Sequence, residues 1–273
     1  MSEESHHSRT GRGSGRTRRQ VLGTLGVTAV TGLAGCLDGG GSDDSTTTPG
    51  RISRRYAVDV DEGRAAFHVD IPKSEYVTAR DRSRSFTRAA NAARESPALE
   101  RLGRQIARTY SSDADRLLAA QAVVTDIEYA RDIESTDQRE YIRYPAETIA
   151  ERMGDCEDLA FLLAGLLSSS ALDFRTGFVI PEGHCAVLVD TADVPATLLA
   201  SDPLTVRFGG REYVYVEAVE AHAPGAWARD YGTRSLLVAY RDGWYPLDTA
   251  ALADHSIEML TDRDVGSVVE FFQ

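Results

Sequence analysis

The sequence predicts an α+β domain, in which helices come first along the chain and antiparallel strands follow. Between residues 85 and 168, apolar residues recur at spacings of three and four, which is the pattern of helices that bury one face. From residue 173 onward, short apolar runs alternate with polar residues and are separated by turns that contain Gly or Pro. Because helices and strands are segregated along the chain, we expect an antiparallel sheet.

Each N-terminal element has a local signal. Residues 55–71 alternate in places around Asp61-Glu62-Gly63, which predicts two short strands joined by a turn. The helical pattern over 85–110 breaks at Ser96-Pro97, where a new helix is expected to begin. Ser112 is a suitable N-cap for the helix that follows.

The second half of the domain begins with a polar stretch, 129–144, that we expect to be a loop. Pro145 then starts a short helical turn. The run from Cys156 to Ser168 is apolar nearly all round, which predicts a buried helix. A C-terminal helix is expected over 257–272. The strands between these helices are expected at 173–180, 184–190, 211–220, 236–240 and 244–247, and the last two form a hairpin.

The first 36 residues have the features of an export signal. After a polar start, Arg18 and Arg19 lie in a Thr-Arg-Arg-Gln-Val-Leu sequence that matches a twin-arginine motif. The mildly apolar stretch over 21–35 is too short for a membrane span and suits a signal peptide. Its end, Leu-Ala-Gly-Cys36, resembles a lipobox. We therefore predict a twin-arginine lipoprotein signal over 1–36, with lipidation at Cys36.

The domain boundaries follow from composition. Residues 37–54 are rich in Gly, Ser, Thr and Asp and are predicted to form a disordered tether. The folded domain is expected over 55–273. With a lipid on Cys36, it would be exported and held at the outer face of the cell membrane.

The charge balance limits the possible partners. The formal net charge is −12 at pH 7, Lys73 is the sole lysine, and residues 1–36 contribute five of the arginines. An acidic chain that keeps Arg and almost lacks Lys resembles proteins of halophiles, whose surface charges are screened at molar salt. We expect no nucleic-acid partner, because no basic stripe lies outside the N-terminus.

The buried helix opens with Gly154-Asp155-Cys156-Glu157-Asp158, the most informative sequence in the chain. Gly154 gives the backbone freedom to turn, Asp155 suits an N-cap, and the carboxylate of Asp158 can reach back to that cap. Cys156 falls in the first helical turn, where the helix dipole should lower the pKa of its thiol. The alternative is a buried, inert cysteine in a core helix.

A cysteine nucleophile needs a base and a group that orients the base. His184 opens the second strand of the expected sheet, and Glu217 lies among aromatic and apolar residues of the next strand. A carboxylate in such a place needs a partner, and the imidazole could be that partner. The alternatives are a polar histidine at a strand end and a solvated glutamate on an edge strand. Strand alternation should turn Cys185 away from the site.

These residues together resemble the transglutaminase-like superfamily, most closely its exported archaeal and bacterial branch. The resemblance covers roughly residues 85–231 and rests on 140–148, 154–158, 181–184 and 213–217. It implies a papain-like core, in which a buried helix carrying the cysteine packs on an antiparallel sheet that bears the histidine and the acid. It also implies a catalytic triad of Cys156, His184 and Glu217. The stretch 244–248 also resembles the acid-bearing strand of some relatives, so Asp248 is the alternative acid.

The implied activity is cleavage or transfer of amide bonds in protein or peptide, with hydrolysis favoured. The main-chain N–H of Cys156 would bind the oxyanion. The family's second donor is a side chain upstream, often Gln, which we place near Thr125 or Gln121. Asp155 and Asp158 would have supporting roles. No cofactor is implied, and no metal is expected, because the chain lacks metal-binding spacings of Cys and His. The alternative function is a catalytically silent binding or assembly module.

Overall fold

The computed structural model describes residues 50–181, 183–208, 210–227, 235–240 and 244–249. The chain divides into two units, residues 1–42 and 43–273, and every described residue belongs to the second. The predicted signal at 1–36, the tether up to residue 49 and the predicted helix at 257–272 lie outside the described residues. No helix among the described residues is long and apolar enough to cross a membrane.

The described chain begins with the predicted pair of strands. β1 (Arg51–Val60) and β2 (Gly63–Pro72) form an antiparallel hairpin that pairs along its whole length. Gly63 takes a φ of 120° at the turn, a conformation that favours glycine. The hairpin packs on α3 and α4, which are defined below, and buries one face there through Tyr56, Val58, Phe67, Val69 and Ile71.

The helical pattern is confirmed. An unpredicted helix, α1 (Lys73–Arg80), directly follows the hairpin. Ser96 caps the helix that begins at the predicted break, and Ser112 caps the next, accepting a hydrogen bond from the Asp115 N–H at 3.0 Å. These helices are α2 (Phe86–Arg94), α3 (Pro97–Thr109) and α4 (Asp113–Thr125).

The polar stretch expected to be a loop contains structure of its own. β3 (Glu128–Tyr129) and α5 (Asp132–Ser135) lie in it, followed by α6 (Pro145–Glu151) and β4 (Met153–Gly154). β3 and β4 pair in parallel. The prediction of a plain loop was wrong because elements of two to four residues are too short to produce a periodic pattern.

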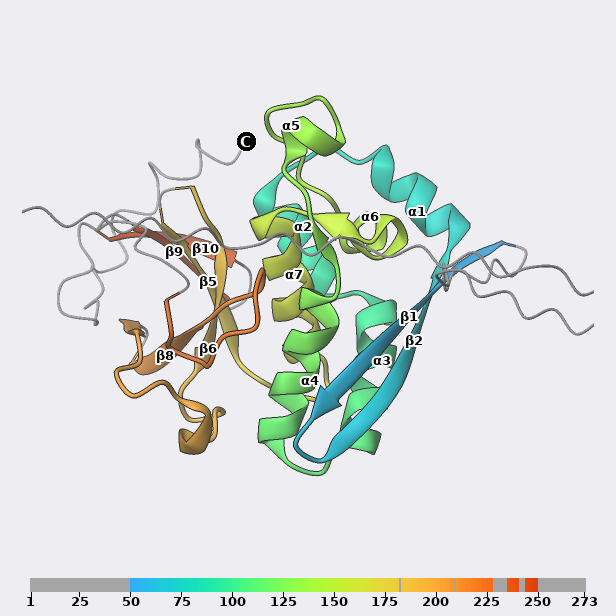
Figure 1. The fold of residues 1–273 in the computed structure, drawn as a ribbon. Coiled ribbons are helices and arrows are strands. Elements are labelled where there is room, and N and C mark those ends of the chain that lie inside the picture. Colours follow the sequence, from blue (N-terminus) through green and yellow to red (C-terminus); the bar gives the residue numbers. More distant parts are fainter. Residues whose placement is uncertain (1–49, 182, 209, 228–234, 241–243, 250–273) are drawn as a thin grey trace, which may run out of the picture. The chain divides into compact units, whose positions relative to one another are not determined.

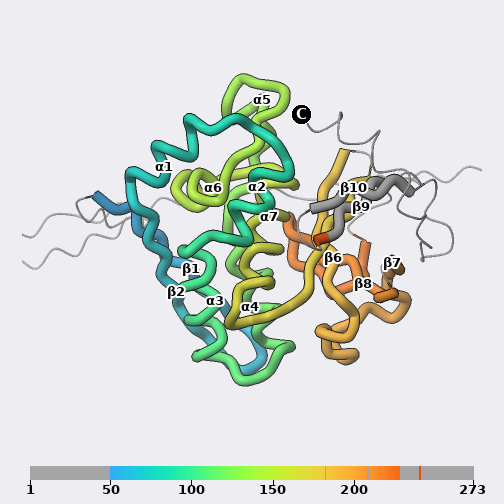
Figure 2. Tube along the Cα trace, turned by 180° about the vertical axis from the view of Figure 1, so that it is seen from behind, coloured from blue at the N-terminus to red at the C-terminus, as the bar shows by residue number. Residues whose placement is uncertain are grey.

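The predicted buried helix is α7 (Cys156–Leu167), and it occupies the centre of the fold (Figure 1). α2, α3, α4 and α6 pack around it, and its remaining side packs on the sheet strands β5 and β6 (Figure 2). A Cβ atom on Gly165 would lie 2.7 Å from the main chain of Ala93, so the glycine permits α2 and α7 to approach closely.

The six-stranded sheet has the order β10-β9-β5-β6-β8-β7, and all neighbouring strands are antiparallel. The predicted α+β class is therefore confirmed, whereas β7 and the short 3-10 helix η1 (Ala196–Leu198) were not predicted. The strands are β5 (Thr176–Pro181), β6 (Ala186–Asp190), β7 (Thr205–Phe208), β8 (Arg211–Val216), β9 (Ser235–Tyr240) and β10 (Trp244–Thr249).

Both faces of the central strands are buried. Phe178, Val187 and Val214 join the large core around α7. Leu188 and Tyr215 point to the other face, where they pack with residues such as Leu204 and Val206 in a smaller core. This alternation follows from the antiparallel register, in which Leu188 lies opposite Tyr215.

Two predicted strands are shorter than expected, and the difference concerns the candidate site. β6 begins after His184, which lies in a turn where its N–H donates to the carbonyl of Pro181 at 3.2 Å. Gly183 has a φ of 69° in that turn. β8 ends before Glu217. Because β6 and β8 are antiparallel neighbours, the start of β6 and the end of β8 lie at one edge, which brings His184 and Glu217 together.

Candidate active site

The histidine and the glutamate form a buried pair. His184 Nε2 lies 3.0 Å from Glu217 Oε2, and the two residues are 7% and 1% exposed. Glu217 also accepts hydrogen bonds from the hydroxyl of Tyr215 and from the N–H groups of Ala218 and Val219. Burial alone would raise the pKa of Glu217, but the hydrogen bonds from His184, Tyr215 and Val219 hold it below its ordinary value.

Cys156 faces the same cavity as this histidine. The cavity has a volume of about 790 Å³ and is lined by both residues, together with Tyr129, Asp155 and Glu157. The helix start supplies the cysteine, and the turn before β6 supplies the histidine. The structure therefore brings together all three residues that sequence reasoning assigned to a triad.

The thiol of Cys156 is held in its neutral form, contrary to the sequence prediction. Its Sγ donates a hydrogen bond to Glu157 Oε2 at 3.2 Å, and the residue is 9% exposed. Burial raises the pKa of Cys156 far above its ordinary value, and the carboxylates of Glu157 and Asp155 raise it further. The N–H of Cys185 points to the sulfur and lowers this pKa only partly. The helix N-terminus alone suggested the opposite, because desolvation could not be read from the sequence.

The start of α7 is fixed by a buried ionic network. The N–H of Asp155 donates to Asp158 Oδ2 at 3.4 Å, so the predicted reach-back of Asp158 is confirmed. Asp158 also accepts from the main chain of Arg143 at 2.7 Å and from its guanidinium at 3.1 Å. Arg143 is 1% exposed and pairs with Asp132 at 2.9 Å. Sequence reasoning missed Arg143, whose sole signal is its place between the apolar residues Ile142 and Tyr144.

Gly154 is required for a different reason from the one predicted. It is not among the described glycines with positive φ. A Cβ atom there would lie 2.8 Å from the Cβ of Asp158 and 3.1 Å from a methyl group of Thr148. Gly154 therefore allows α6 to pack closely on the first turn of α7, and the backbone needs no unusual conformation.

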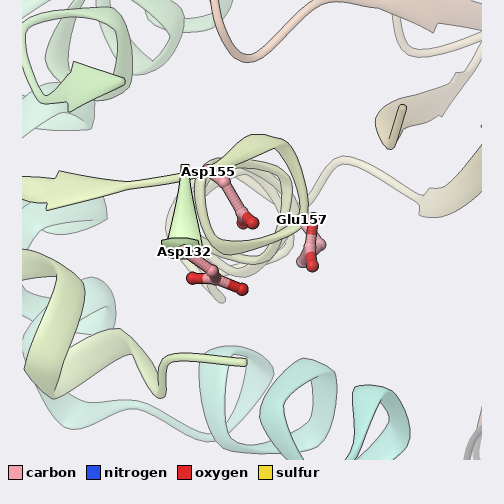
Figure 3. Close-up of side chains that lie close together, drawn as sticks. All are labelled: Asp132, Asp155 and Glu157. Atoms are coloured by element: carbon pink, nitrogen blue, oxygen red, sulfur yellow. The ribbon is translucent and has the colours of Figure 1, made fainter. Parts of the chain in front are cut away.

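Three carboxylates surround the first turn of α7 (Figure 3). Asp132, Asp155 and Glu157 each place one oxygen within 4.8 Å of the others and could in principle ligate a cation. Burial raises the pKa of Asp155 to about 10, helped by the charges of Asp158 and Glu157. The guanidinium of Arg143 pairs with Asp132, so one of the three carboxylates is engaged in the ionic network described above.

Neither residue predicted to supply the second oxyanion donor is placed for that role. The side-chain amide of Gln121 donates to the carbonyls of Glu217 at 2.9 Å and His222 at 3.1 Å. The hydroxyl of Thr125 donates to the carbonyl of Ala122 at 3.4 Å and lines a different cavity, of about 390 Å³. The expectation for Thr125 and Gln121 was wrong because their side chains face away from the cysteine's cavity.

The two remaining predicted residues have different outcomes. Cys185 is buried in the core as expected, but it also lines the cavity of Cys156, because it precedes β6 and strand alternation does not apply to it. Both cysteines are free thiols. Asp248 lies in β10, which β9 and β5 separate from β6. The side chain of Asp248 is outside the described part of the chain.

Comparisons with known proteins do not extend this description. No protein-family model matches the chain, and no curated protein is detectably similar to it. A function for the chain must therefore be argued from the sequence motifs and from the geometry of the cavity.

Proposed function

We propose that this chain is a transglutaminase-like thiol enzyme that cleaves or transfers amide bonds of protein or peptide. Cys156 is the nucleophile, His184 the general base and acid, and Glu217 the residue that orients the imidazole. One observation carries the proposal: His184, which contacts the buried Glu217 at 3.0 Å, lines the same cavity as a cysteine at a helix N-terminus. The Gly154–Asp158 motif and the chain order of the three residues support it.

Each ring nitrogen has a role in this proposal. Glu217 holds Nε2 of His184 at 3.0 Å, and the proton of the thiol is exchanged through Nδ1. The sulfur would attack the amide carbon while His184 takes the thiol proton, and the departing amine would then receive that proton. Water, or an amine in a transfer reaction, would attack the resulting thioester and restore the thiol.

The neutral resting thiol affects the timing of this proton transfer. Burial and the carboxylates of Glu157 and Asp155 favour the protonated sulfur before substrate binds. The proton would therefore leave as the carbon–sulfur bond forms, so the reaction depends on His184 as a base and does not begin from a stored thiolate.

The test is labelling with iodoacetamide followed by peptide-substrate profiling, in high salt, on the chain without its lipid. Wild type should be labelled at Cys156 and should turn over peptide, and Cys156→Ala should do neither. His184→Ala should slow both reactions, whereas the matched variant Cys185→Ser should keep turnover. Labelling that is insensitive to His184, combined with no turnover, would reject the enzyme.

A second candidate is a catalytically silent binding or assembly module. The raised pKa of Cys156 favours it, because a buried protonated thiol is a poor nucleophile. This candidate predicts that Cys156→Ala keeps all ligand binding and that no acyl-enzyme forms with any amide or ester.

The location of the enzyme is part of the proposal. Export by the twin-arginine signal and lipidation of Cys36 would hold the domain at the outer face of the membrane, where protein or peptide is the substrate. Membrane fractionation of wild type and Cys36→Ala tests the anchor, which fails if both fractionate alike. Adaptation to high salt is tested by thermal melting in dilute buffer and in molar KCl, and fails if dilute buffer gives the higher stability.

A further inference from the structure

Attack on a carbonyl creates an oxyanion that needs preorganised hydrogen-bond donors. The main-chain N–H of Cys156 is one candidate, and a second donor must reach the same point of the cavity. Gln121 and Thr125 are engaged elsewhere. The second donor must therefore be a side chain that lines the cavity of the sulfur.

Tyr129 is fixed beside the nucleophile by main-chain hydrogen bonds. In the parallel bridge between β3 and β4, Tyr129 lies opposite Gly154, two residues before Cys156. The N–H of Glu128 donates to Arg152 at 3.1 Å, and the N–H of Ala130 donates to Gly154 at 2.9 Å. These two bonds flank Tyr129, so its backbone is held against the strand that leads into α7.

The side chain of Tyr129 is placed to meet a substrate. It lines the cavity that contains Cys156 and His184, and 47% of the residue is exposed. Large apolar residues are seldom this exposed in the described part of the chain, where Val77 and Ile133 are the others. Ile133 lines the same cavity, so two of these three exposed residues line it.

The pKa of the Tyr129 phenol also depends on Cys156. Burial raises the pKa of Tyr129, and a negative charge on the Cys156 sulfur would raise it further, ahead of the effect of Asp155. The hydroxyl is therefore near enough to the sulfur for the charges to interact, and it keeps its proton at neutral pH. A protonated phenol is a hydrogen-bond donor, which is the property that an oxyanion requires.

We propose that the hydroxyl of Tyr129 donates a hydrogen bond to the oxyanion that forms when Cys156 attacks a carbonyl group. This inference rests on the proposed thiol chemistry. In the step concerned, the carbon–sulfur bond forms as the carbonyl π bond breaks, and the electron pair moves to the oxygen, where Tyr129 binds it. His184 receives the thiol proton. Collapse of the intermediate restores the carbonyl group and expels the leaving group.

The test uses p-nitrophenyl acetate, an acyl donor that needs no knowledge of the natural substrate. Acylation of Cys156 releases p-nitrophenol in a burst. The acylation rate is the rate of this release minus the rate measured with Cys156→Ala. Removing one oxyanion donor from an enzyme costs about 100- to 1000-fold in rate, and we expect a loss of about 10- to 100-fold for this half-exposed group in Tyr129→Phe. Alkylation by iodoacetamide forms no tetrahedral oxyanion and should stay unchanged.

Tyr110→Phe is the matched control, because Tyr110 donates to Gly63 at 3.2 Å, away from the cavity. It should acylate like wild type, and both variants should show wild-type melting curves. Equal acylation by wild type and Tyr129→Phe would overturn the assignment of Tyr129 while leaving the thiol enzyme intact. A parallel loss of acylation and alkylation would overturn it as well, since the residue would then act on the thiol. If wild type gives no burst above Cys156→Ala, the proposed function itself fails.

Discussion

Glu157 should suppress the reactivity of Cys156, and its replacement by Gln tests this directly. The carboxylate accepts a hydrogen bond from the thiol of Cys156 at 3.2 Å. Burial is the largest cause of the raised thiol pKa, and the charge of Glu157 is the next. A glutamine at this position would keep the size and shape of the side chain and remove the charge. We therefore expect Glu157→Gln to lower the pKa of Cys156.

The magnitude follows from the distance. At 3.2 Å, two unit charges repel by about 1.3 kcal/mol with the dielectric constant of water and by about 5 kcal/mol with the effective value of about 20 that suits sites near a protein surface. These energies correspond to a decrease of about 1 to 4 pKa units. At a pH below the thiol pKa of wild type and of Glu157→Gln, the substitution should raise the thiolate fraction and the alkylation rate at least about tenfold.

The assay is the rate of iodoacetamide alkylation as a function of pH, read by mass spectrometry at Cys156. Because the wild-type pKa is raised, the rate should increase with pH, and the Glu157→Gln curve should lie at lower pH. Glu140→Gln is the matched control, since Glu140 lines the cavity without a hydrogen bond to the sulfur. Superimposable curves for wild type and Glu157→Gln would refute the argument that this carboxylate keeps the thiol protonated.

Three further predictions concern stability and the choice of acid. Arg143→Ala leaves buried carboxylates unpaired and should lower the free energy of unfolding by about 3 to 5 kcal/mol, measured by urea denaturation; a loss below about 1 kcal/mol would contradict the structural role of the network. Gly165→Ala forces a methyl group against Ala93 and should cost about 1 to 3 kcal/mol in the same measurement, with an unchanged unfolding free energy as the contrary result. Glu217→Gln should abolish acylation by p-nitrophenyl acetate while Asp248→Asn retains it, and the reverse pattern would transfer the role of acid to Asp248.

The sequence supports the fold prediction best where the elements are long. The stripe of α3, the serine caps and the apolar run of α7 all leave a periodic or capping signal, and each was predicted near its observed bounds. β3 and β4 were missed because a two-residue bridge has no period and depends on a partner distant in sequence. The same limit hid Tyr129, whose position beside Cys156 depends on that bridge.

The candidate site could be predicted in its residue types but not in its electrostatics. Cys156, His184 and Glu217 could be named from their order along the chain; Cys156 and His184 line one cavity, and Glu217 contacts His184 behind it. The sign of the thiol pKa shift was predicted wrongly, because burial and the direction of the Glu157 carboxylate are properties of the packed structure. A helix N-terminus indicates a favourable field for an anion, and the side chains around it decide the net effect.

Gln121 joins α4 to the segment after β8 that carries Glu217. Its amide, on α4, donates to the main-chain carbonyls of Glu217 and His222, and the side chain is 2% exposed. A separation of α4 from this segment would break both hydrogen bonds and would release the residues around Glu217. The positions of Cys156, on α7, and of Glu217 should therefore be disrupted in one cooperative transition. Alkylation protection at Cys156 and helical circular dichroism should then be lost at the same denaturant concentration.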